Sequence, residues 1–130
     1  MKPTNRRSFL QATGAAMAFP FVGKVLGANE KLNIGVVGVA GRGGSNLRGV
    51  AAVKESNIAA LCDVDLKNLT AAGKQYPDAR RYRDFRRMLE QKDLDAVVCS
   101  TPDHTHAIVG VSALKSGRHL YCEKPLAHTV

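Results

Sequence analysis

Tryptophan is absent from this sequence, and aromatic residues make up only 5% of its 130 residues. Proteins that hold single-stranded nucleic acid stack bases on aromatic side chains set among basic ones, and no such alternation is present. One basic cluster does occur, which we interpret as a solvated helix face that steers an anionic ligand, the alternative being a nucleic-acid patch. Its members are Arg80, Arg81, Arg83, Arg86 and Arg87. We therefore expect no nucleic-acid partner.

Cysteine is also scarce, and the three cysteines form no C-x-x-C pair. An odd number without that pair argues against a disulfide framework. Cys62, Cys99 and Cys122 each lie near the end of an apolar segment, so we interpret them as small core residues. A Cys99–Cys122 disulfide is the alternative if their strands are neighbours. No nucleophile stands beside a base partner, so nothing supports covalent acyl chemistry.

A run of about 20 apolar residues, as a membrane span requires, is missing too. The weakly apolar segment from Phe9 to Val22 is shorter, and it follows Asn5-Arg6-Arg7-Ser8-Phe9-Leu10. This start resembles a twin-arginine export signal, the alternative being two arginines by chance. Residues 1–28 hold half of the formal net charge of +8. We predict a signal over 1–28, export by the twin-arginine machinery to the periplasm or beyond, and no stable membrane anchor.

Apolar and amphipathic segments alternate along the remainder, residues 31–130. The apolar segments show little alternation between apolar and polar residues, which is typical of strands covered on both faces. We predict strands over 32–39, 57–63, 81–83, 95–100 and 119–123. We predict helices over 43–54, 66–75 and 106–116, and another after Asp84, with Asp65 and Asp84 as N-caps. This order predicts an α/β domain with a doubly wound parallel sheet.

A glycine-rich turn follows the first predicted strand and contains Gly38, Ala40, Gly41, Arg42 and Gly43. A glycine turn between a strand and a helix exposes backbone N–H groups that can bind a pyrophosphate. Asp63 ends the second predicted strand, where an acid can hold the ribose hydroxyls of a dinucleotide. Strand, turn, helix and acid together predict a Rossmann-type dinucleotide-binding domain. Asp63 would repel a 2′-phosphate and favours NAD, although Arg42 leaves NADP possible.

Two later loops carry polar residues at the carboxyl ends of predicted strands, where such sheets bind ligands. The first contains Ser100, Thr101, Pro102, Asp103, His104 and His106. We place His104 near the nicotinamide. Because no third ligand accompanies His104 and His106, we expect no metal. The alternative is that Asp103 caps the next helix and His106 lies in its first turn. The second loop, Glu123-Lys124-Pro125, offers a lysine that can assist proton transfer or can be an ordinary surface lysine.

Four motifs in this order resemble the Gfo/Idh/MocA oxidoreductases, which include glucose-fructose oxidoreductase and inositol 2-dehydrogenase. The motifs are Gly38–Gly43, Leu61–Asp65, Thr101–His106 and Glu123–Leu126, and the resemblance covers about residues 31–130. It implies that Gly38, Gly41, Arg42 and Gly43 cradle the pyrophosphate and that Asp63 binds the adenosine ribose. Ala40 stands where a second glycine is usual. Ser100, Thr101, Pro102 and His104 would lie along the nicotinamide, and Glu123 beside its ribose. Lys124 matches the catalytic lysine and is also expected to contact the cofactor.

The family also implies a second, C-terminal α/β domain that binds substrate and often forms the oligomer contact. The sequence ends at Val130, just past a predicted strand, so we expect a fragment that is truncated before that domain and inactive alone. The complete protein is predicted to be an exported NAD(P)-dependent oxidoreductase of a sugar, inositol or related polyol, and a homo-oligomer. The alternatives are an NAD-dependent glycosidase that oxidises its sugar transiently, and a non-catalytic nucleotide-binding fragment.

Overall fold

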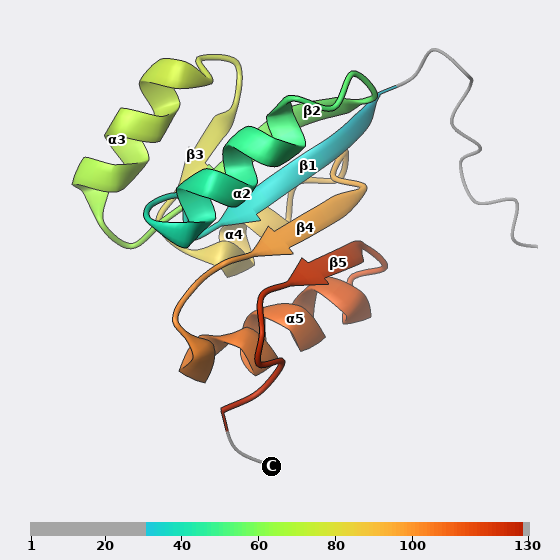
Figure 1. Ribbon diagram of the computed structural model, residues 1–130. Coiled ribbons are helices and arrows are strands. Elements are labelled where there is room, and N and C mark those ends of the chain that lie inside the picture. Colours follow the sequence, from blue (N-terminus) through green and yellow to red (C-terminus); the bar gives the residue numbers. More distant parts are fainter. Residues whose placement is uncertain (1–30, 129–130) are drawn as a thin grey trace, which may run out of the picture.

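The computed structural model describes residues 31–128, which form a parallel sheet with helices on both faces (Figure 1). Its five strands lie in the order β3-β2-β1-β4-β5. They are β1 (Leu32–Val37), β2 (Ser56–Cys62), β3 (Arg80–Tyr82), β4 (Ala96–Cys99) and β5 (His119–Cys122). The chain starts in the middle of the sheet, runs outward to β3, returns to β4 and continues to β5. The predicted doubly wound α/β fold is confirmed.

Helices connect successive strands and cover the two faces in pairs. Helices α2 (Arg42–Ala51) and α3 (Leu66–Gln75) lie on one face, and α4 (Phe85–Leu89) and α5 (His106–Lys115) on the other (Figure 1). A short 3-10 helix, η1 (Asp103–Thr105), precedes α5. The strand order reverses between β1 and β4, and an open α/β sheet binds its ligands at such a reversal, beyond the carboxyl ends of the strands.

The sheet separates two apolar cores. Val36 and Leu61 are fully buried under α2 and α3, whereas Val97 and Met88 are fully buried on the α4 and α5 side. Residues pointing to either face of the central strands are thus withdrawn from water. This double burial explains why the sequence of β1 shows no alternation of apolar and polar residues.

The predicted N-caps are confirmed. The Asp65 carboxylate accepts a hydrogen bond from the Lys67 N–H at 2.8 Å, and the Asp84 carboxylate accepts one from the Arg86 N–H at 2.9 Å. Each satisfies a backbone donor that the first turn of a helix leaves free, a contribution of about 1 kcal/mol. These caps fix where α3 and α4 begin, close to the sheet edge that binds ligands.

Several predicted boundaries were wrong. Helix α2 ends at Ala51 rather than Lys54, because the Ser56 hydroxyl donates to the carbonyls of Val50 and Val53 and closes the turn. Strand β1 ends at Val37, because Gly38 leaves the extended conformation with φ 84°. Asp103 does not cap α5 but begins η1, and the N-cap Thr105 makes no side-chain cap.

The predicted signal over residues 1–28 lies outside the residues that the structure describes. Within residues 31–128, no helix has both the length and the apolar character needed to cross a membrane.

Candidate cofactor-binding site

The glycine turn between β1 and α2 is shaped by backbone conformations that other residues rarely adopt. Gly38 has φ 84° and Gly41, the N-cap of α2, has φ 53°. A Cβ on Gly38 would lie 2.7 Å from the Ser100 carbonyl oxygen, whereas a Cβ on Gly41 would meet nothing within 4 Å. A Cβ on Gly43 would overlap the Gly38 carbonyl. Gly38 and Gly43 thus allow close packing within the domain, and Gly41 permits the turn itself.

The N-terminus of α2 is suited to an anion. No side chain caps it and no acidic residue lies in its first turn. Among the described residues, the backbone N–H groups of Arg42 and Gly43 have no protein acceptor. Free N–H groups at the positive end of a helix dipole form a site for phosphate. The residues present therefore fit the pyrophosphate of a dinucleotide.

Asp63 lies immediately after β2 and is held by two backbone groups. Its Oδ2 accepts from the Val39 N–H at 3.0 Å, and its Oδ1 accepts from the Asp65 N–H at 2.9 Å. These bonds connect the acid to the glycine turn and fix its orientation. Each carboxylate oxygen retains a lone pair for a ribose hydroxyl.

A cleft of about 730 Å³ opens beside these residues. Predicted site residues that line it are Gly38, Ala40, Asp63, Ser100, Thr101, Pro102 and His104. Phe85, Arg86 and Arg83 also line this cleft. The guanidinium carbon of Arg86 lies 4.8 Å from the centroid of the Phe85 ring. These arginines were predicted to lie on a solvated helix face, and Phe85 was not among the predicted site residues. A flat aromatic ring beside a cation suits the adenine end of a dinucleotide.

A second cavity of about 520 Å³ lies beside the first, since Ser100 and Thr101 line both. It also contains Arg42, Asp103, His106, Glu123 and Lys124. The two predicted loops thus meet the glycine turn at one edge of the sheet. Gly41 and Gly43 line neither cavity. They act through the conformation of the turn, which only small residues allow.

Glu123 is anchored to α2. Its Oε1 accepts from Arg42 Nε at 3.0 Å and from Asn46 Nδ2 at 2.8 Å. Asn46 also donates to the Ser100 hydroxyl at 2.9 Å, so one amide connects both loops to the helix. Asn46 was not among the predicted site residues. In the sequence, only its position one helical turn after Arg42 indicated that it could share a site with that arginine.

These donors lower the pKa of Glu123, the hydrogen bond from Asn46 first and that from Arg42 second. We expect Asn46→Ala to raise the Glu123 pKa toward its ordinary value, measured by NMR titration of the carboxyl carbon. Since the folded-state pKa is lowered, the stabilisation is present above the ordinary pKa and is lost as pH falls through the lowered value. An unchanged Glu123 titration in the variant would contradict this assignment; Asn57→Ala, away from the site, is the control.

Lys124 and His104 are both exposed toward solvent at the carboxyl edge of the sheet. Lys124 follows β5 and precedes a cis bond to Pro125. His104 Nδ1 lies 3.9 Å from the Asp103 carboxylate, and its side chain is 68% exposed. Both positions are accessible to a bound ligand, and the roles assigned to them from sequence stay predictions.

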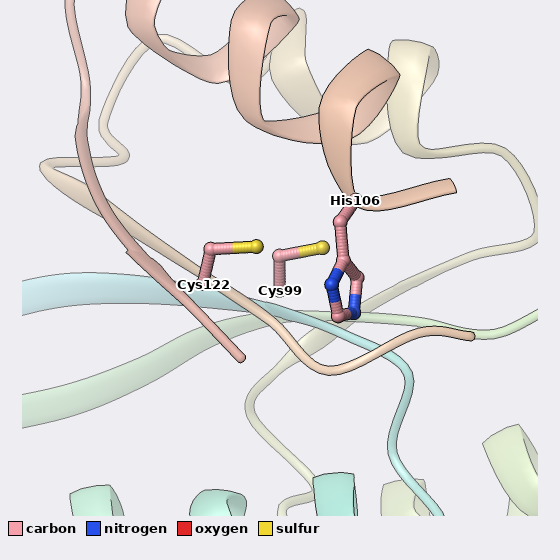
Figure 2. A group of neighbouring side chains, drawn as sticks. All are labelled: Cys99, His106 and Cys122. Atoms are coloured by element: carbon pink, nitrogen blue, oxygen red, sulfur yellow. The ribbon is translucent and has the colours of Figure 1, made fainter. Parts of the chain in front are cut away.

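His106 lies beside two thiols, an arrangement that the sequence did not reveal (Figure 2). The ligand atoms of Cys99, His106 and Cys122 are all within 4.8 Å of one another. However, His106 Nδ1 lies 2.6 Å from the Pro125 carbonyl oxygen and Nε2 lies 2.7 Å from that of Thr101. Each ring nitrogen already lies within hydrogen-bond distance of a carbonyl oxygen, so the group does not fit a metal ion.

The Cys122 thiol is a poor nucleophile. Cys99 and Cys122 are register partners on neighbouring strands, as a disulfide would need, and both are free. Burial, followed by the neighbouring Cys99, raises the pKa of Cys122 to about 11, so its thiol is protonated near neutral pH. Cys62 and Cys99 are buried as expected, whereas Cys122 is only partly buried.

Fold and site together define a Rossmann domain that binds a dinucleotide. The profile of the Gfo/Idh/MocA oxidoreductase family, described as having an NAD-binding Rossmann fold, matches residues 32–130. The chain belongs to this family, and the described residues form its NAD-binding Rossmann domain.

Among curated relatives, a glycosyl hydrolase family 109 protein of Solibacter usitatus is 39% identical over 113 residues. That match covers 78% of this chain and 26% of the relative. Inositol 2-dehydrogenase of Salmonella typhimurium is 34% identical, with coverage of 75% and 30%. The chain thus spans less than a third of the length of these relatives.

Solved structures of two related enzyme forms have the same fold over the matched residues. Apo scyllo-inositol dehydrogenase from Lactobacillus casei superposes with a TM-score of 0.73 at 28% identity, covering 77% of this chain and 30% of that one. The same enzyme with bound NAD(H) and scyllo-inositol gives a TM-score of 0.71 at 28% identity, covering 75% and 29%.

Proposed function

We propose that the complete protein is an NAD-dependent oxidoreductase that transfers a hydride between the cofactor and a sugar, inositol or related polyol. The observation that supports this most is that two adjacent cavities share Ser100 and Thr101, which places Lys124 at the same sheet edge as the uncapped N-terminus of α2 and Asp63. Family membership and the inositol dehydrogenase relatives support the substrate class. Because these relatives are much longer than this chain, we infer a second domain that would complete the substrate site and form a homo-oligomer.

Different residues of this chain would bind different parts of the dinucleotide. Arg42 and the amides of α2 would hold the pyrophosphate, and Asp63 would accept hydrogen bonds from the adenosine ribose, favouring NAD over NADP. Ser100, Thr101, Pro102 and His104 would flank the nicotinamide, with Glu123 near its ribose. Bound NAD supplies the hydride acceptor. Lys124 would take the proton from the substrate hydroxyl as the adjacent carbon is oxidised to a carbonyl.

The proposal is tested by incubating the complete protein with NAD and a panel of inositols, aldoses and polyols. We expect stoichiometric formation of carbonyl product and NADH, followed by absorbance at 340 nm. If no member of a broad panel reduces NAD although the dinucleotide binds, the redox function is wrong.

The glycosyl hydrolase family 109 relative favours a second candidate, a glycosidase that oxidises its sugar transiently. Such an enzyme would return the hydride after the leaving group departs. Cleavage of nitrophenyl glycosides that requires NAD, without net NADH, would identify this function and exclude net oxidation.

We further propose that the protein is exported by the twin-arginine route, on the basis of Arg6 and Arg7 in the sequence. Replacing both with lysine should leave the protein in the cytoplasm, measured by fractionation and immunoblotting. Lys2→Gln and Lys24→Gln serve as charge controls. Equal export of the double-lysine variant would contradict the proposal.

A further inference from the structure

The buried imidazole of His106 has no assigned task in cofactor binding. His106 is the first residue of α5 and is 2% exposed, and with Gln91 it is one of two polar residues buried among residues 31–128. A polar ring enclosed in this way is costly unless its nitrogens are hydrogen-bonded. The identity of its partners therefore indicates what the ring is for.

Both partners are backbone carbonyls of the loops that carry the predicted site. Nε2 reaches the Thr101 carbonyl at 2.7 Å, in the loop after β4, and Nδ1 reaches the Pro125 carbonyl at 2.6 Å, in the loop after β5. A neutral ring donates to one of the two at a time, whereas the doubly protonated ring donates to both. The ring thus lies between the two loops, hydrogen-bonded to one carbonyl when neutral and to both when doubly protonated.

The bridge lies beyond the end of the strand ladder. The Glu123 N–H donates to the Cys99 carbonyl at 3.0 Å, the last backbone bond between the two segments among the described residues. Lys124 and Pro125 follow this bond, so the ladder does not fix them. Cys99 and Cys122 fill the space on one side of the ring (Figure 2). His106 itself lines the cavity that contains Lys124.

We propose that His106 is a positioning residue that sets the separation between the Thr101-Pro102 loop and Lys124. The proposal rests on the proposed function, because that separation matters only if the nicotinamide lies by one loop and the substrate proton is transferred at the other. Misplacing a catalytic group by about 1 Å can cost about 100-fold in rate. Removal of the bridge should therefore lower kcat while the adenosine end of the cofactor still binds.

The test compares three variants of the complete protein. His106→Leu removes both donors and keeps an apolar side chain, and His106→Asn keeps an amide donor for one carbonyl. Ala113→Gly is the matched control, because Ala113 is fully buried on the same helix two turns later and its side chain has no group that could hydrogen-bond to either loop carbonyl. The readouts are kcat, KM, NADH affinity by fluorescence, thermal stability, and hydrogen–deuterium exchange of residues 123–128.

We expect His106→Leu to lower kcat by about 10- to 100-fold with NADH affinity changed less than about threefold. His106→Asn should recover part of kcat, and Ala113→Gly should reduce thermal stability with kcat retained. Wild-type kcat in His106→Leu, or an equal loss of kcat in Ala113→Gly at matched stability, would overturn the proposal. If His106→Leu does not fold, kcat of His106→Asn is compared with kcat of Ala113→Gly instead, and an equal kcat in the two variants at matched stability would overturn the proposal.

Hydrogen exchange separates this proposal from the proposed function. If the wild-type protein oxidises no polyol, the function fails, yet the bridge is still tested by exchange in the loop. Faster exchange over residues 123–128 in the His106 variants than in Ala113→Gly supports the bridge. Equal exchange in all of them rules it out.

Discussion

Replacing Lys124 with alanine in the complete protein is expected to lower kcat by about 10²- to 10⁴-fold, the range for loss of a general acid–base group. Lys124 is exposed and lines the cavity with Glu123, and among the described residues its side chain makes no hydrogen bond or ion pair. The substitution should therefore leave the fold and NADH affinity nearly unchanged. Steady-state kinetics and fluorescence titration of NADH provide the measurement.

Two further variants make this result specific. Lys115→Ala removes another exposed lysine, from the last turn of α5, and should retain wild-type kcat. Lys124→Arg keeps the charge but should restore little activity, because a guanidinium does not exchange a proton near neutral pH. Wild-type turnover in Lys124→Ala would remove this residue from the mechanism, whatever its place in the motif.

Features that depend on local sequence could be predicted well. The glycine turn, the N-caps Asp65 and Asp84, and the order of strands and helices each follow from a few consecutive residues. Parallel strands with right-handed crossovers then leave few arrangements of the sheet. Asp63 could be placed near the turn because the ends of neighbouring parallel strands meet at one edge.

The contacts that connect the loops could not be predicted. Asn46 reaches Glu123 across 77 positions, and His106 reaches Pro125 across 19. Such pairs depend on side-chain direction and on backbone carbonyl positions, which no periodicity in the sequence records. Phe85 could not be assigned to the site from the sequence, because an apolar residue at helical spacing is usually buried in a core, yet it borders the larger cleft.

Gly38→Ala is expected to destabilise the protein by about 2–5 kcal/mol and to abolish NAD binding. Its φ of 84° costs an alanine about 1–2 kcal/mol, and the new Cβ would lie 2.7 Å from the backbone oxygen of Ser100. Forcing a methyl group against backbone adds about 1–3 kcal/mol, since the end of β4 has to move. Denaturant unfolding and calorimetric titration with NAD measure the two effects.

Two other glycines separate these causes. Gly117 has φ 79° with nothing within 4 Å of a built Cβ, so Gly117→Ala should cost only the conformational part, about 1–2 kcal/mol. Gly49 lies within α2 in open space, and Gly49→Ala should stabilise the protein by about 0.5–1 kcal/mol. If Gly38→Ala costs no more than Gly117→Ala, the glycine is needed for the turn alone. A larger cost shows that the Ser100 backbone packs against the turn, which joins the pyrophosphate end of the site to the nicotinamide end.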